Sequence, residues 1–74
     1  MQFNELDVVK TRREFSEYGI NKGDIGVIIF SFDSPDEAYE VEFDDGEGKP
    51  KAAFPILPQY LELAYADLGY ASGK

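Results

Sequence analysis

The chain has 74 residues, no cysteine, no histidine and a formal net charge of −8. This length allows one domain, and the missing thiols and imidazoles exclude disulfides, thiolate metal sites and the commonest general base. No apolar run approaches the ~20 residues of a membrane span, and residues 1–5 lack the regions of a signal peptide. We therefore expect a cytoplasmic protein without cofactor or metal, with one domain over residues 1–68 and a frayed tail over 69–74.

The first half of the chain predicts two strands separated by a long loop. Residues 6–11 are rich in β-branched side chains and indicate the first strand. The charged, turn-rich segment 12–22 carries three apolar anchors for the core, Phe15, Tyr18 and Ile20. Residues 26–32 give the strongest strand signal, and their apolar character on both faces is typical of a central strand.

The second half predicts a hairpin followed by an ambiguous segment. In residues 38–43, Tyr39, Val41 and Phe43 fall on one face, while Glu40 and Glu42 fall on the other. Residues 44–46, Asp-Asp-Gly, indicate a hairpin turn, and residues 49–54 return antiparallel to the preceding strand. Pro55 and Pro58 limit further ladder bonding, so this strand is an edge strand or ends early. Residues 59–68 fit either a helix or a short last strand over 61–63 that follows a helical turn at Pro58. Closing such short strands into a small barrel would protect their edges.

The net charge is concentrated in residues 33–47, which hold eight acids and no Lys or Arg. Such a field repels nucleic acid and anionic lipid and attracts basic proteins. The segment is either a surface for a basic partner or a solvated face that keeps a small domain soluble. The candidate partner-binding residues are Asp36, Glu37, Glu40, Glu42, Asp44 and Asp45. The acids around Gly46 lack the ligand spacing of a calcium loop, and we interpret them as a plain hairpin turn.

Five aromatic residues raise the question of a base-stacking platform: Phe30, Phe32, Tyr39, Phe43 and Phe54. Because they lie beside acids and not in a basic groove, we interpret them as core residues.

Residues 27–32 carry one apolar residue too many for a one-sided sheet. Either both faces are buried at a bend, or Val27 and Ile29, with Ser31 on their face, form an exposed patch for a partner or a second copy of the chain.

Three segments together resemble a known family. They are residues 5–9 (ELDVV), residues 18–28 (YGINKGDIGVI) and residues 39–43 (YEVEF) followed by an acidic glycine turn. In this order they are similar to a bacterial family of short proteins known as a domain of unknown function, over roughly residues 4–63. The resemblance implies an SH3-like barrel without catalytic residues. Some members are encoded beside toxins, which implies an immunity or antitoxin role.

These observations predict a mostly β protein, a small SH3-like barrel of four to five antiparallel strands with a long first loop and a short helical turn near the C-terminus. We expect no enzyme, because serines lack a histidine to activate them and no phosphate-binding motif is present. The predicted function is protein binding, as an immunity or antitoxin protein that blocks a basic toxin through the acidic segment. The alternative is an accessory subunit that docks on a larger enzyme; a weak homodimer fits either function, and neither binds nucleic acid or membranes.

Overall fold

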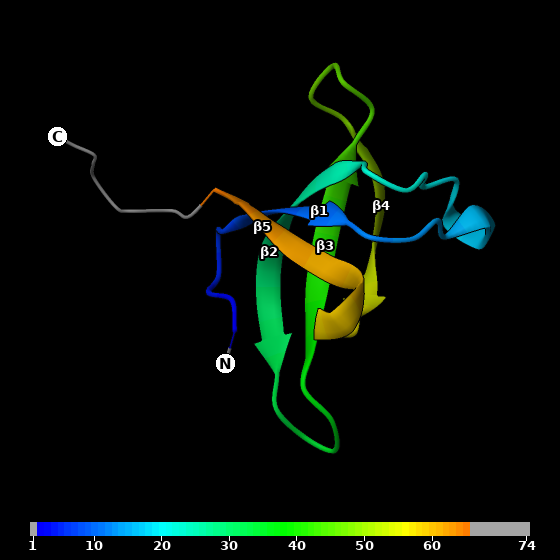
Figure 1. The fold of residues 1–74 in the computed structure, drawn as a ribbon. Coiled ribbons are helices and arrows are strands. Elements are labelled where there is room, and N and C mark those ends of the chain that lie inside the picture. Colours follow the sequence, from blue (N-terminus) through cyan, green and yellow to red (C-terminus); the bar gives the residue numbers. More distant parts are fainter. Residues whose placement is uncertain (1, 66–74) are drawn as a thin grey trace, which may run out of the picture.

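Residues 2–65 are described by a computed structural model (Figure 1). Five strands and two short 3-10 turns follow one another: β1 (Val8–Thr11), η1 (Ser16–Tyr18), β2 (Ile25–Phe32), β3 (Ala38–Asp44), β4 (Pro50–Ile56), η2 (Pro58–Tyr60) and β5 (Leu61–Tyr65). No α-helix occurs in this part of the chain. The predictions of a mostly β fold, a long first loop and a short helical turn near the C-terminus are therefore confirmed. Of the two alternatives left open for the segment after Pro58, the short last strand is the one found within residues 61–65. The predicted tail, 69–74, lies outside the described residues.

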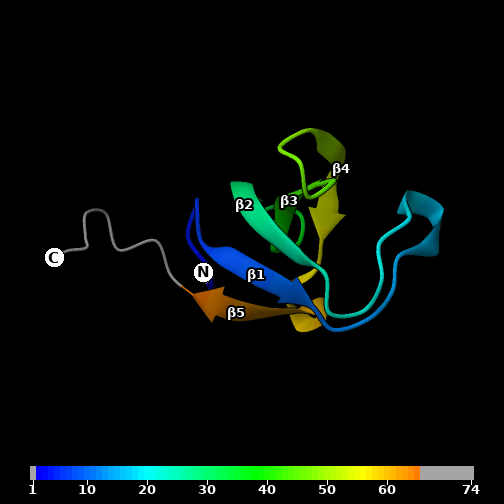
Figure 2. The ribbon, with the colours of Figure 1, turned by 90° about the horizontal axis from the view of Figure 1, so that it is seen from above.

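All strands belong to one antiparallel sheet in the order β4-β3-β2-β1-β5. The sheet bends strongly, so that β1 and β5 run across the direction of β2 and β3 (Figures 1 and 2). Within residues 2–65, β4 and β5 are not paired with each other, and the predicted closure into a barrel is wrong. Pro50 and Pro55 help to explain the open edge at β4, because proline has no N–H to donate to another strand.

A bulge in β2 decides which side chains face the core. Ile28 pairs with Val41, but the next pair is Phe30 with Glu40, so Ile29 is an extra residue opposite β3. Side chains alternate along a strand, and an extra residue reverses the alternation beyond it. Ser31 therefore pairs with the buried Tyr39, and the predicted sharing of a face by Val27, Ile29 and Ser31 is wrong.

The core lies on the concave side of the sheet. Tyr39, Val41 and Phe43 are at most 2 % exposed, as their alternation predicts. The other buried apolar residues are Phe3, Val9, Phe15, Ile20, Ile28, Phe54, Ile56 and Leu61. The first loop is fastened to this core because Phe15 and Ile20 are buried and the half-exposed Tyr18 stacks on Phe54 with ring centroids 3.7 Å apart.

Residues 2–5, in which the sequence predicts no strand or helix, are also part of the fold. The backbone N–H groups of Gln2 and Phe3 donate to the Tyr39 hydroxyl at 2.9 and 3.1 Å, and the Phe3 ring meets the Tyr39 ring edge-on. Leu6 N–H donates to the Ile28 carbonyl at 2.7 Å. The start of the chain is thereby held against the middle of β2 and the first residues of β3. No helix within residues 2–65 is long and apolar enough to cross a membrane.

Candidate protein-binding face

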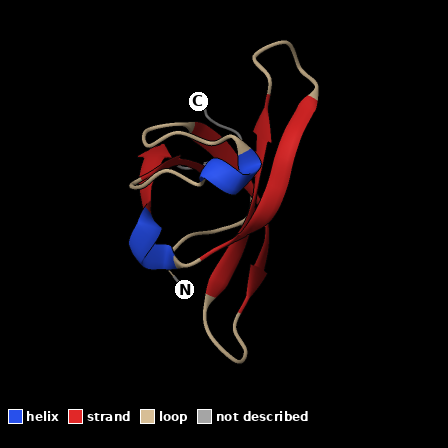
Figure 3. Ribbon diagram, turned by 90° about the vertical axis from the view of Figure 1, so that its right-hand side faces the viewer, coloured by secondary structure: helices blue, strands red, loops and turns tan. Residues whose placement is uncertain are grey.

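The convex side of β2, β3 and β4 carries the central acids of the predicted site. We call it the outer face and define it by Val27, Phe30, Phe32, Ala38, Glu40, Glu42, Ala53 and Pro55. Its strands are the longest in the described part of the chain, and their two hairpin loops lie at opposite ends (Figure 3). Because β3 alternates, Glu40 and Glu42 point away from the core, as predicted. Glu42 is exposed and Glu40 is half-buried.

Each of these two acids has apolar neighbours on the adjoining strands. Glu40 lies between Phe30 on β2 and Pro55 on β4, and Glu42 lies between Val27 and Ala53. Within residues 2–65 the one ion pair joins Lys10 to Glu62, at 3.6 Å, on β1 and β5. The carboxylates of Glu40 and Glu42 therefore have no cation partner in this part of the chain, and a basic group from outside would find them accessible.

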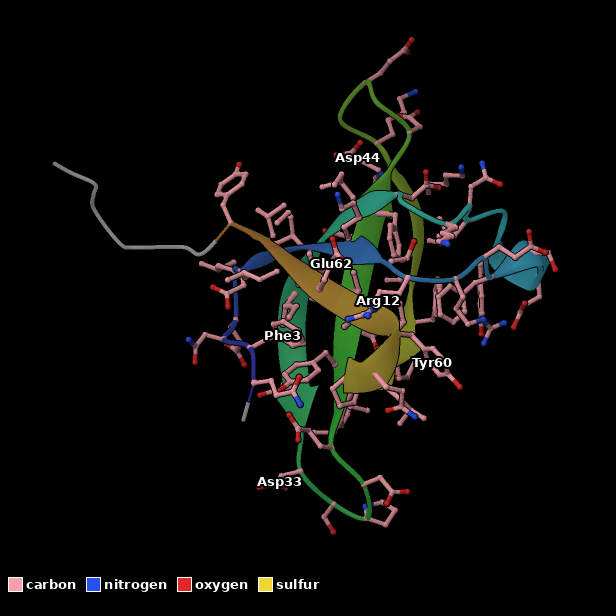
Figure 4. All side chains as sticks on the ribbon, in the orientation of Figure 1. Phe3, Arg12, Asp33, Asp44, Tyr60 and Glu62 are labelled. Atoms are coloured by element: carbon pink, nitrogen blue, oxygen red, sulfur yellow. The ribbon has the colours of Figure 1, made fainter. Side chains whose placement is uncertain are left out.

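The predicted acids at the ends of β3 lie in the two hairpin regions. Figure 4 shows Asp44 near one loop and Asp33 at the other. The Asp44 carboxylate accepts from Gly46 N–H at 2.8 Å, and the Asp45 carboxylate accepts from Glu47 N–H at 2.8 Å and from Lys49 N–H at 3.2 Å. Both side chains thus shape the β3–β4 loop. Lys51 lines the same hollow as these two acids.

Glu37 faces a different side from Glu40 and Glu42. It lies two residues before Tyr39, and its carboxylate accepts from the Tyr39 hydroxyl and from Gln2 N–H. These hydrogen bonds, the Tyr39 bond first, lower the pKa of Glu37. Burial and the hydrogen bond to Glu37 raise the pKa of Tyr39. Glu37 therefore helps to hold the N-terminal segment, whereas Asp36, next to it in the β2–β3 turn, is exposed.

Phe30 and Phe32 were expected in the core, and this expectation is wrong. Their side chains are 51 % and 37 % exposed, with ring centroids 4.9 Å apart. The bulge at Ile29 turns both rings to the outer face. Tyr39, Phe43 and Phe54 are buried as predicted. The excess of apolar residues in β2 was the sequence signal for an exposed apolar surface, but it pointed to Val27 and Ile29. In the structure Val27 is half-buried and Ile29 is 41 % exposed.

The cations of the described chain gather mainly around β1 and the first loop. Lys10, Arg12 and Lys22 line a hollow that also includes Glu62, and Figure 4 shows Arg12 and Glu62 together on this side. The Arg13 guanidinium lies 4.3 Å from the centre of the Phe15 ring.

Residues 2–65 contain no group of three or more His, Cys, Asp or Glu side chains arranged to hold a metal ion. The outer face is thus acidic and apolar, without the basic groups that bind phosphates.

Comparison with known proteins places the chain in a family. Residues 5–63 match the family model described as domain of unknown function DUF4926, and the chain belongs to this family. The match covers nearly the same residues as the resemblance seen in the sequence. No curated protein and no solved structure matches the chain.

Proposed function

We propose that this chain is a non-catalytic protein-binding module that binds a basic protein through its outer face. The observation that carries the proposal is the position of Glu40 and Glu42, which are held by a regular strand, point away from the core and have no cation partner within the described residues. One-sided charge destabilises a small domain through self-repulsion. Binding a basic partner that neutralises this charge would be a physical reason for the acids to be present. Opposite charge would mainly speed association and select basic partners.

The test is to capture the partner from the source cell and then measure its association rate at low and high salt. The variant Glu40→Lys/Glu42→Lys should associate at least about tenfold more slowly at low salt, because steering by charge raises association rates by this much or more. The matched control is Glu14→Lys/Glu17→Lys, which changes the net charge equally but alters acids in the first loop. Equal rates for both folded variants, with no salt dependence, would contradict the proposal.

An immunity or antitoxin role is the more specific form of this function and stays a prediction. It requires that the partner be a toxin whose activity the wild-type chain blocks and the Glu40→Lys/Glu42→Lys variant does not. The alternative, an accessory subunit that docks on a larger enzyme, is supported by the exposed rings of Phe30 and Phe32. Salt-independent binding that depends on these two rings would favour the accessory subunit.

A further inference from the structure

One end of the outer face is hollowed and apolar. The end of β2, the β2–β3 turn and the end of β4 enclose a shallow cavity of about 300 Å³. Its apolar lining consists of Phe32, Pro35, Ala38, Pro55 and Leu57. This volume is at the lower limit of small-molecule pockets, so it suits one large side chain better than a whole ligand.

The cavity continues into the acidic part of the outer face. The Phe32 ring contacts the Phe30 ring, and Phe30 pairs across the strands with Glu40. Glu40 in turn pairs with Pro55, which lines the cavity. Asp36 stands at the cavity itself and is exposed. An apolar depression is thus bordered by carboxylates on the turn and on β3.

This arrangement has the anatomy of a small protein-binding site. Binding energy concentrates where an apolar side chain fills a pocket that a polar rim surrounds. Phe32 and Leu57 in the cavity lining and Phe30 beside it are 37 %, 39 % and 51 % exposed, so this apolar surface is accessible to a partner. Contiguous exposed apolar patches on soluble proteins mark interaction sites, whereas single exposed apolar side chains are ordinary.

Charge decides between the occupants of this cavity. A second copy of the chain would bring another net charge of −8 to a cavity that Asp36 and Glu40 border and that lies near Glu42. A nucleic acid would be repelled in the same way. A protein segment with Lys or Arg beside a large apolar residue satisfies both the carboxylates and the cavity.

We propose that the cavity at Phe32 and Leu57 takes one aromatic or large aliphatic side chain of the partner, from a segment that places a Lys or Arg against Asp36 or Glu40. The inference rests on the proposed function and adds the chemistry of the partner segment. The apolar anchor sets how long the complex lasts, because truncating such contacts mainly changes the dissociation rate. The acids set how fast it forms.

The experiment is a display selection of random 12-residue peptides against the immobilised full-length chain. The enriched peptides should carry Phe, Tyr, Trp, Leu, Ile or Met within three positions of Lys or Arg. A synthetic copy of the best peptide is then titrated against the wild type, Leu57→Ser and the matched control Leu63→Ser, which alters an exposed leucine on β5. Leu57→Ser should weaken binding about tenfold or more, as loss of a central anchor does, and Leu63→Ser should leave it unchanged.

A second variant guards against a folding defect in Leu57→Ser. Ala38→Leu enlarges a side chain that lines the cavity and should also weaken peptide binding. Amide chemical shifts of residues 32–38 and 55–57 should move when the wild type binds. Basic peptides without an apolar residue that bind Leu57→Ser normally but fail on Glu40→Lys/Glu42→Lys would overturn this inference and leave the proposed function standing.

Three other results would also count against the inference. Apolar peptides that bind the charge variant as well as the wild type would overturn the proposed function with it. Self-association of the wild type that Leu57→Ser abolishes would assign the cavity to a second copy. A selection that enriches no sequence would overturn the inference outright.

Discussion

Removing one hydroxyl group, in Tyr39→Phe, should loosen the start of the chain. The Tyr39 hydroxyl accepts from Gln2 N–H and from Phe3 N–H and donates to the Glu37 carboxylate. The ring itself is fully buried and packs against Phe3, so phenylalanine keeps the packing and loses only the three hydrogen bonds. The Phe3 N–H is buried and would be left without a partner, whereas water can reach Gln2 and Glu37.

A buried donor without a partner costs about 1–3 kcal/mol, and this is the destabilisation we expect. For a domain of this size each kcal/mol lowers the melting temperature by about 4–8 °C. The assay is thermal and urea unfolding of the wild type, Tyr39→Phe and the control Tyr18→Phe, whose exposed ring keeps its stacking on Phe54. If Tyr39→Phe and Tyr18→Phe unfold at the same midpoint, the hydroxyl does not hold residues 2 and 3.

Two further predictions concern the same strands. Because its pKa is lowered in the folded chain, Glu37 contributes fully to the free energy of unfolding above the ordinary carboxyl pKa, and this contribution is lost as pH falls through the lowered pKa. The urea midpoint should therefore fall less on acidification for Glu37→Gln than for the wild type. Parallel plots of urea midpoint against pH for the two proteins would argue against this. Gly26→Ala would place a Cβ atom 2.6 Å from Val41 Cγ1 and 2.9 Å from Phe43 Cε2. We expect about 1–3 kcal/mol of destabilisation from this overpacking, and an unchanged urea midpoint would refute it.

The sequence predicts β3 well because one side of this strand faces the core and the other faces solvent. Under that condition the alternation of Tyr39, Val41 and Phe43 with Glu40 and Glu42 is enough to assign both faces. The β3–β4 turn is equally local, since Asp45 and Gly46 adopt the loop through their own side-chain and backbone preferences. The acidic centre of the candidate site was therefore accessible to sequence reasoning.

Contacts between distant residues were not accessible in this way. Glu37 is one of eight acids in its segment, and only the folded chain brings it to Gln2, 35 residues earlier. Barrel closure depends on whether β4 and β5 meet, and no local pattern states this. Over residues 59–65 the ambiguity between helix and strand is resolved by the 3-10 turn at Pro58 and by the pairing of Leu61 with Thr11. Residues 66–68 of that segment lie outside the described residues.

The bulge at Ile29 links the fold to the candidate binding face. If β2 kept the register of Ile28 with Val41, Phe30 would lie opposite Tyr39 and Phe32 opposite Glu37, on the core side. The bulge turns both rings to solvent beside Glu40 instead. Burying a phenylalanine fully is worth roughly 1.5–3 kcal/mol, and each of these partly exposed rings forgoes a fraction of that stabilisation. A partner that covers the rings would restore that burial in the complex, which is why we place the apolar anchor at this end of the outer face and not at Val27.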